Sequence, residues 1–256
     1  MDWNLRPARD LGLTPADRLR SLGREPGLVG LAVNTAWRRA VRAYLRTAHS
    51  FRIEGQDNLP RSGPFVMVAN HASHLDALAL SAALRGPAAR RAHALAAGDL
   101  FFANSARAAL SAYAINALPV WRGRSRRGDL DTMRARLAED SLAYILFPEG
   151  TRSRTGEMAP FQPGLGMLVA GTDIPVVPCW LEGAREAWPA QSRLPRPGSP
   201  LTLTIGSPLH FPETRNDRTG WEAVSSQAEA AVRGLAPFRQ GGAQTAPGGQ
   251  KPPEPA

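Results

Sequence analysis

Short apolar runs alternate with helical segments from residue 51 onward, and this alternation constrains the fold more than any other feature of the chain. Buried strands separated by helices are typical of an α/β domain. The predicted strands cover residues 51–54, 65–69, 92–97, 118–121, 142–147, 176–181 and 201–205. The predicted helices cover residues 73–85, 102–114, 129–140, 165–171 and 222–235. The sequence therefore predicts an α/β fold with about seven strands in its sheet.

Three regions of different composition divide the chain of 256 residues. Residues 1–48 are expected to form an N-terminal helical hairpin, whose first helix starts at the N-cap Thr14 with Pro15 in its first position. Residues 49–236 contain the alternating strands and helices, and this length fits one domain. Residues 237–256 are rich in glycine, proline and glutamine, which bury little apolar surface, so this tail is expected to be disordered.

The second helix of the hairpin, predicted over residues 28–45, is both amphipathic and basic. Its apolar residues at helical spacing are Val33, Trp37, Val41 and Tyr44. Arginines recur at four-residue spacing, namely Arg38, Arg42 and, just past the end of this range, Arg46, with Arg39 beside them. Two interpretations are open. The helix lies in the headgroup layer of a membrane, or its apolar face packs on the domain and its arginines are solvated.

The formal net charge of +9 favours an anionic partner, which could be a nucleic acid, an anionic membrane surface or a phosphorylated substrate. Nucleic-acid binding predicts aromatic and basic residues interleaved on one face, or a known binding module. The sequence has neither, so no nucleic-acid partner is expected. Cys179 is the single cysteine, which excludes an intramolecular disulfide and a cysteine-based metal cluster.

The sequence contains no obvious membrane span. No window approaches the roughly 20 apolar residues that are needed to cross a bilayer. Residues 1–6 lack the basic segment and apolar stretch of a secretory signal. We therefore expect a cytoplasmic protein, which would sit peripherally on the inner face of the membrane if it acts on lipids.

A polar cluster, His71-Ala72-Ser73-His74-Leu75-Asp76, follows the predicted strand over residues 65–69. His71 is expected in the turn between strand and helix, where the carboxylate of Asp76 can reach it. A carboxylate bonded to one imidazole nitrogen fixes the tautomer and leaves the other nitrogen to take a proton from an alcohol. Asp76 could instead only cap the helix, in an S-x-x-D arrangement with Ser73. His74 is a rival base, although we expect it to project into solvent.

A second polar cluster, Pro148-Glu149-Gly150-Thr151-Arg152-Ser153, follows the predicted strand over residues 142–147. An arginine in a turn that contains glycine is suited to holding a phosphate, because guanidinium groups bind phosphate oxygens in pairs. A base in one cluster and a phosphate-binding arginine in the other together suggest acyl transfer to an alcohol that carries a phosphate.

These clusters belong to four sequence blocks that occur in order over about residues 50–210. The first is residues 71–76, an H-x4-D block preceded by Asn70, and the third is the intact run over residues 147–153. The second is residues 116–122, in which Asn116 replaces the usual glycine six residues before Arg122, and the fourth is residues 174–178. In these blocks the chain resembles the glycerolipid acyltransferase family, typified by lysophosphatidic acid acyltransferases.

The resemblance implies a glycerol-3-phosphate acyltransferase-like fold, a mixed sheet of about seven strands flanked by helices and preceded by the helical hairpin. It also implies that His71 is the general base and that Asp76 orients it and balances its charge. The implied substrate-binding residues are Arg122, Glu149, Gly150, Thr151 and Arg152. Arg152, with Arg122, would hold the phosphate, while Glu149 and Gly150 position the glycerol portion and shape the turn. Arg122 could alternatively be ordinary surface charge, since further arginines follow it.

The fourth block is implied to line the acyl or thioester side of the site. Its residues are Ile174, Pro175, Val176, Val177 and Pro178. Proline has no backbone N–H to donate to a neighbouring strand, so we expect this strand at an edge of the sheet or irregular.

The implied function is that of a membrane-associated O-acyltransferase in phospholipid biosynthesis. It would move a fatty acyl group from acyl-CoA or an acyl carrier protein thioester to the free hydroxyl of 1-acyl-sn-glycerol 3-phosphate, giving phosphatidic acid. The implied chemistry needs no metal and no cofactor beyond the thioester co-substrate. Two alternatives stay open: an acyltransferase for another lyso-lipid, such as a lyso-ornithine lipid or a lysophospholipid, and a catalytically silent lipid-binding protein.

Overall fold

The computed structural model describes residues 7–25, 27–98, 105–120, 127–192 and 194–237. Most of the tail predicted as disordered, residues 238–256, lies outside the described residues. None of the helices in the described ranges is both long enough and apolar enough to span a bilayer.

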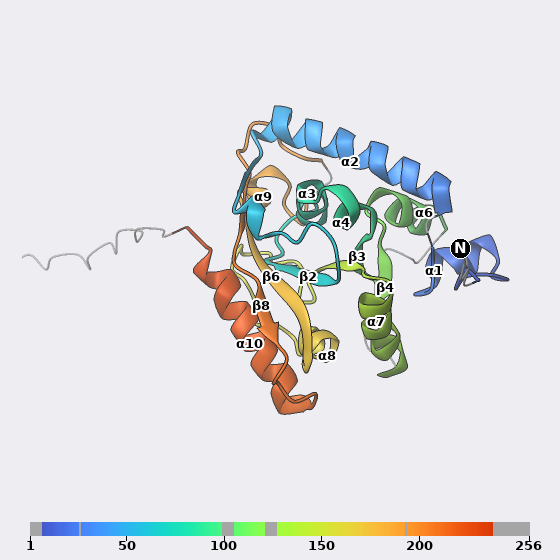
Figure 1. The fold of residues 1–256 in the computed structure, drawn as a ribbon. Helices are drawn as coiled ribbons and strands as arrows, with labels where there is room; N and C mark the ends of the chain where they lie inside the picture. Colours follow the sequence, from blue (N-terminus) through green and yellow to red (C-terminus); the bar gives the residue numbers. More distant parts are fainter. Residues whose placement is uncertain (1–6, 26, 99–104, 121–126, 193, 238–256) are drawn as a thin grey trace, which may run out of the picture.

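A mixed sheet forms the centre of the described structure (Figure 1). Its strands are β1 (Arg52–Glu54), β2 (Phe65–Ala69), β3 (Ala92–Ala97), β4 (Leu118–Val120), β5 (Ala143–Leu146), β6 (Thr172–Glu182), β7 (Thr202–Ile205) and β8 (Leu209–Phe211). They follow the order β1-β7-β6-β2-β5-β3-β4, and β8 pairs with β6. Strand β2 is parallel to both β5 and β6, whereas β6 is antiparallel to β7 and β8. The predicted α/β fold with a mixed sheet is confirmed, and β8 is a strand that the sequence did not predict.

Strand β2 lies in the middle of this sheet, and all five of its residues are buried. Its unbroken apolar sequence fits this position, because a central parallel strand is covered by helices on both faces. Strand β6 also lies inside the sheet, not at an edge. The irregularity that its prolines allow is present, since its register against β8 shifts between Thr172 and Val176.

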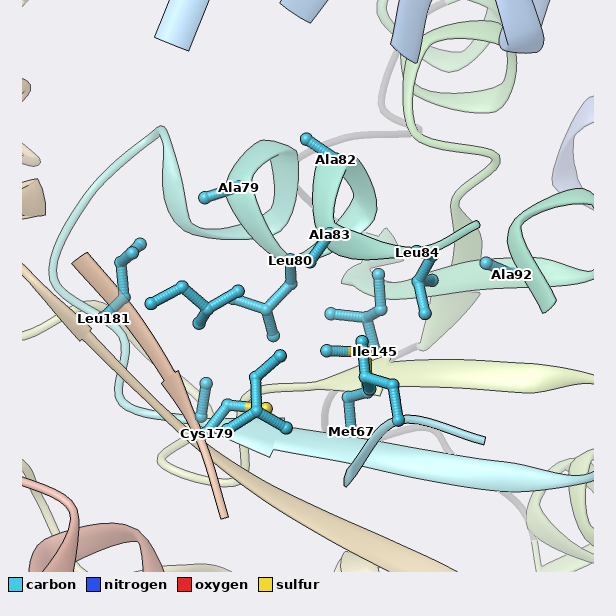
Figure 2. Packing of buried hydrophobic residues seen from close by; sticks show 14 of the residues in the cluster. Met67, Ala79, Leu80, Ala82, Ala83, Leu84, Ala92, Ile145, Cys179 and Leu181 are labelled. Carbon is cyan, nitrogen blue, oxygen red and sulfur yellow. The ribbon is translucent and has the colours of Figure 1, made fainter. Parts of the chain in front are cut away.

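Helices cover both faces of the sheet. They are α1 (Pro15–Arg20), α2 (Gly27–His49), η1 (Gln56–Asn58), α3 (Asp76–Ala83), α4 (Gly86–Arg90), α6 (Ser105–Ala114), α7 (Arg127–Glu139), α8 (Gly164–Val169), α9 (Ala184–Ala187) and α10 (Arg218–Gly234). One buried cluster joins Met67 of β2 to residues of α2, α3 and α4, and Figure 2 shows α3 lying over β2, β5 and β6. A second cluster joins Val66 and Val68, on the other face of β2, to α7, α8 and α10.

Helices α3 and α10 begin three and four residues away from their predicted starts. Helix α3 begins at Asp76 and not at Ser73, because the Ser73 hydroxyl donates to the carbonyl of Trp188 and accepts from the N–H of Leu75. Helix α10 begins at Arg218, one turn earlier than expected. Asp217 caps it by accepting a hydrogen bond from the N–H of Gly220, a capping residue that the prediction overlooked.

Both helices predicted for residues 1–48 are present. Thr14 caps α1 as expected, and its side chain accepts from the N–H of Asp17. Helix α2 packs on α3 and α6, across the top of the domain in Figure 1. The interpretation in which its arginines are solvated and its apolar face is covered is wrong for two arginines. Arg38 is 9% exposed, and Arg42 donates to carbonyl oxygens at the end of α3, whereas Trp37 remains 41% exposed.

Candidate active site

The two polar clusters meet at the carboxyl ends of two neighbouring strands in the middle of the sheet. Strands β2 and β5 are parallel neighbours, with Val68 opposite Leu146, so their carboxyl ends lie side by side. The imidazole of His71 stacks on the ring of Phe147 with their centroids 4.1 Å apart and their planes 16° apart. The N–H of Ser153 donates to the carbonyl of His71 at 2.7 Å. The topology thus brings the first and third sequence blocks together.

His71 and Asp76 form a hydrogen-bonded pair, with Nδ1 of His71 at 2.7 Å from Oδ2 of Asp76. The same carboxylate oxygen accepts the backbone N–H groups of Ala72 and Ser73, each at 2.8 Å. The side chain of Asp76 is 1% exposed and that of His71 is 21% exposed. With a hydrogen on Nδ1 directed at the carboxylate, Nε2 carries the lone pair that a general base needs.

The carboxylate of Glu149 accepts a hydrogen bond from the backbone of His71. Its Oε1 accepts the N–H of His71 at 2.6 Å and its Oε2 accepts the N–H of Ala159 at 2.9 Å. Burial raises the pKa of Glu149, and the two backbone hydrogen bonds oppose that rise. Both oxygens of Glu149 therefore accept hydrogen bonds from backbone N–H groups.

Gly150 shapes the turn of the third block. Its φ is +74°, in the left-handed region that glycine adopts without strain, and its N–H donates to the carbonyl of Phe147 at 3.1 Å. Thr151, the next residue, is exposed. After β5 the chain thus turns at Gly150 and continues past His71 to Arg152.

Arg152 lies against His74. Its Nη1 is 2.6 Å from Nδ1 and 2.8 Å from Nε2 of that imidazole. The prediction that His74 projects into solvent is wrong, because its ring is half-buried 5.1 Å from the ring of Trp188. Desolvation lowers the pKa of Arg152, while the charge of Asp76 raises it. The pairing of Arg152 with His74 was missed from the sequence, where no spacing rule connects residues 78 positions apart.

The second block is described only in part, since Arg122 lies outside the described residues. Asn116 has a φ of +50°, which is the left-handed geometry expected of a residue in place of glycine. Its side chain is also occupied: Oδ1 accepts from buried Arg24 at 2.9 Å, and Nδ2 donates to the carbonyl of Ala92 at 2.9 Å. Asn116 thus connects the N-terminal segment to the start of β4 through hydrogen bonds.

The fourth block forms part of β6, and its residues do not share one face. Val177 belongs to the cluster beneath α3, whereas Ile174 and Val176 belong to the cluster on the side of α8 and α10. Neighbouring residues of a strand point to opposite faces of the sheet. The lining of the acyl or thioester side of the site by residues 174–178 therefore stays a prediction, and residues on opposite faces of β6 cannot share one surface there.

Known proteins resemble this chain in sequence. The family model named Acyltransferase matches residues 50–182, which is just over half of the chain. A 1-acyl-sn-glycerol-3-phosphate acyltransferase of Cocos nucifera is 40% identical over 73 residues, covering 28% of this chain and 23% of that protein. The 1-acyl-sn-glycerol-3-phosphate acyltransferase alpha of Homo sapiens is 31% identical over 141 residues, covering 53% of this chain and 47% of that protein. The chain thus spans about half or less of the length of either relative.

A solved structure shares the fold. The crystal structure of the 1-acyl-sn-glycerophosphate (LPA) acyltransferase PlsC from Thermotoga maritima matches with a TM-score of 0.58 and 22% sequence identity. The match covers 81% of this chain and 78% of that chain. At this identity the likeness concerns the arrangement of helices and strands.

Proposed function

Because the chain belongs to the acyltransferase family, we propose that it transfers a fatty acyl group from a thioester to the free hydroxyl of 1-acyl-sn-glycerol 3-phosphate. The product would be phosphatidic acid, made in phospholipid biosynthesis. The single observation that carries this proposal is the 2.7 Å contact of His71 with buried Asp76, at the sheet edge that also holds Arg152.

In the proposed reaction, Nε2 of His71 removes the proton of the acceptor hydroxyl as its oxygen attacks the thioester carbonyl. Asp76 keeps the ring oriented and stabilises the imidazolium that forms. The tetrahedral intermediate then collapses, the carbon–sulfur bond breaks, and the leaving thiolate takes the proton back from His71. The reaction yields the ester and a free thiol, with the thioester as co-substrate and without a metal or bound cofactor.

The acceptor would be held through its phosphate. A guanidinium offers paired N–H donors to phosphate oxygens, which supports Arg152 in this role, together with Arg122. Glu149, Gly150 and Thr151 would fix the shape of the turn that presents Arg152. The acyl chain would lie along part of residues 174–178, and the donor would be acyl-CoA or an acyl carrier protein thioester.

Helix α2 supports a peripheral position on the inner, cytoplasmic face of an anionic membrane. Its outward apolar residues are Leu28, Val29, Val33, Trp37 and Tyr44, which are 36% to 87% exposed. Arg39 and Arg46, on the same helix, are exposed as well. An exposed apolar face flanked by arginines is typical of a helix that lies in the headgroup layer.

The acceptor is tested by thiol release. The full chain is incubated with liposomes, a thioester donor, and in turn 1-acylglycerol 3-phosphate, a lyso-ornithine lipid, a lysophospholipid and 1-acylglycerol. We expect free thiol and phosphatidic acid with the first acceptor and little thiol with 1-acylglycerol, which lacks the phosphate. Turnover confined to another lyso-lipid rejects the acceptor, and no turnover with any of them favours a silent lipid-binding protein.

A further inference from the structure

Arg38 lies in the middle of the covered side of α2. The buried residues of this helix recur every three or four positions, which places them along one stripe: Gly30, Asn34, Arg38, Val41, Leu45 and His49. The helix packs on α3 and α6, over which it crosses in Figure 1. Arg38 is 9% exposed, whereas the next residue, Arg39, is exposed. A permanent charge thus occupies a position that faces the domain.

The guanidinium of Arg38 has no hydrogen bond and no ion pair with any residue that the structure describes. Two side-chain atoms in the described ranges are fully buried without a partner, and neither of them belongs to Arg38. Its nitrogen atoms are therefore unpartnered but still within reach of a small ligand. Arg42, one turn later, donates instead to the carbonyls of Ala82 and Leu84. Burying an unpaired charge costs free energy, which a bound anion would offset.

The charges that act on Arg38 and Arg42 are all positive. Burial, followed by the charge of Arg42, lowers the pKa of Arg38 to about 10. Burial also lowers the pKa of Arg42, followed by the charges of Arg85 and Arg46. No carboxylate of the described residues opposes either shift. We call these four arginines, Arg38, Arg42, Arg46 and Arg85, the basic seam, and such a region attracts anions.

A groove of about 480 Å³ adjoins the basic seam at Arg85. It lies between residues 56–61 and the start of α4, and Leu84 also lines it. Its charged lining residues are Arg61, Arg85 and Asp57, so its charge is positive on balance. The volume falls within the range of about 300–1,000 Å³ that is typical of small-ligand sites. The groove therefore offers room for a polar headgroup beside the basic seam.

The basic seam is separate from the candidate active site and close to the proposed membrane face. Helix α3 begins at Asp76, the partner of His71, and Arg42 donates to the carbonyls at its other end. The 8 residues of α3 span about 12 Å. Trp37, the residue before Arg38, is 41% exposed on the outward side of α2. A helix that lies in the headgroup layer brings the arginines on its flank to the level of the lipid phosphates.

We propose that the basic seam binds the phosphate of one anionic phospholipid, with Arg38 as the least exposed ligand. The planar guanidinium of Arg38 has five N–H donors and can bind two phosphate oxygens as a pair. The apolar outward side of α2 favours a lipid over free phosphate, because the acyl chains of a lipid would lie beside it. The site differs from general attraction between arginines and a membrane, since it depends on one buried side chain. It does not depend on the proposed reaction.

The test measures binding of short-chain phosphatidylglycerol to the full chain by isothermal titration calorimetry, at concentrations where the lipid is monomeric. Arg38→Met removes the charge and keeps an unbranched side chain. Arg39→Met is the matched control, because it removes the same charge from the exposed neighbouring position. We expect Arg38→Met to weaken binding at least about tenfold, as for the loss of a hydrogen bond to a charged group. Arg39→Met should weaken it less than twofold, and equal losses in the two variants overturn the site.

Urea denaturation separates a binding role of Arg38 from a structural one. Without lipid, Arg38→Met should be at least as stable as wild type, because it removes an unpaired buried charge. With lipid, the urea midpoint of wild type should rise and that of Arg38→Met should stay unchanged. Arg38→Gln, which also removes the charge, takes the place of Arg38→Met if that variant does not fold. A lower midpoint without lipid, combined with wild-type lipid binding, would show a structural role and reject the proposal.

Two further ligands identify the occupant. Short-chain phosphatidylcholine carries a choline charge that cancels the charge of its phosphate, and inorganic phosphate lacks the acyl chains. Both should bind more weakly than phosphatidylglycerol. Equal binding of phosphatidylcholine rejects an anion site, and equally tight binding of inorganic phosphate that depends on Arg38 rejects a lipid as the occupant. None of these measurements involves turnover, and a lipid bound at His71 and Arg152 would not respond to Arg38→Met, so failure of the proposed reaction is distinguishable.

Discussion

Asp76 serves two purposes with one oxygen atom. Oδ2 orients the His71 ring and also accepts the N–H groups of Ala72 and Ser73, so the same buried carboxylate shapes the turn and prepares the base. The spacing of His71 and Asp76 made this pair predictable from the sequence. The partner of Arg152 was not predictable, because His74 is held by residues 188–192, which reach it only through the tertiary fold.

Asp76→Asn tests this double role. The amide oxygen can still accept backbone N–H groups, but the negative charge that stabilises the imidazolium is gone. We expect turnover to fall about 10²- to 10⁴-fold and the free energy of unfolding to fall by about 1–3 kcal/mol. Steady-state thiol release and urea denaturation measure the two effects, with the exposed Asp173→Asn as the control. Near wild-type turnover in Asp76→Asn would remove the carboxylate from the mechanism.

At the scale of helices and strands, the residue pattern of α2 did not determine which face of this helix packs on the domain. The spacing of apolar and basic residues predicted the helix, but Arg38 and Arg42 lie on its covered side. For Arg42 the reason is local chemistry: carbonyl groups at the end of α3 lack partners within that helix, and Arg42 donates to those of Ala82 and Leu84. Such an interaction depends on which helices pack together, which the sequence pattern does not specify.

Arg42→Ala should remove the hydrogen bonds between α2 and the end of α3. Because Arg42 reaches two carbonyl oxygens, we expect the free energy of unfolding to fall by about 1.5–3 kcal/mol, the range for a hydrogen bond to a charged group. The exposed Arg46→Ala, one turn further along α2, should change it by less than about 0.5 kcal/mol. Urea denaturation followed by circular dichroism compares them, and equal stabilities of the two variants would contradict the anchoring role of Arg42.

Strand β3 carries a buried histidine that should make stability depend on pH. Burial, followed by the charges of Arg24 and Arg136, lowers the pKa of His93 from 6.5 to about 3. Between these values the unfolded chain binds a proton at His93 that the folded chain does not. Stability is therefore fully present above pH 6.5 and falls on acidification, by at most about 1.4 kcal/mol per pH unit from this group.

Urea denaturation over pH 4 to 7.5, on wild type and His93→Gln, measures this dependence. Other groups titrate in both proteins, so the difference between the two curves isolates His93. We expect the stability of wild type to decline more steeply below pH 6.5 than that of His93→Gln. Parallel curves would show that His93 is accessible to protons in the folded state.

At the scale of the whole molecule, the sheet order joins residues that the sequence keeps far apart. Strands β2 and β5 are neighbours, so the first and third blocks face each other although 78 residues separate His71 from Glu149. Alternating apolar and helical runs sufficed to predict the α/β class. They did not predict β8 or the interior position of β6, because strand pairing depends on contacts between distant segments. The expectation that the blocks lie close together came from the family resemblance, and the structure shows which of their atoms are in contact.

The most direct test of the account is the rate of phosphatidic acid formation by wild type and His71→Ala, with acyl-CoA and 1-acylglycerol 3-phosphate in liposomes. Circular dichroism confirms that the variant is folded. We predict that wild type forms phosphatidic acid and that His71→Ala is slower by at least about 10²- to 10⁴-fold, the loss expected on removing a general base. A folded His71→Ala that forms phosphatidic acid at the wild-type rate would contradict the central claim that this imidazole is the base.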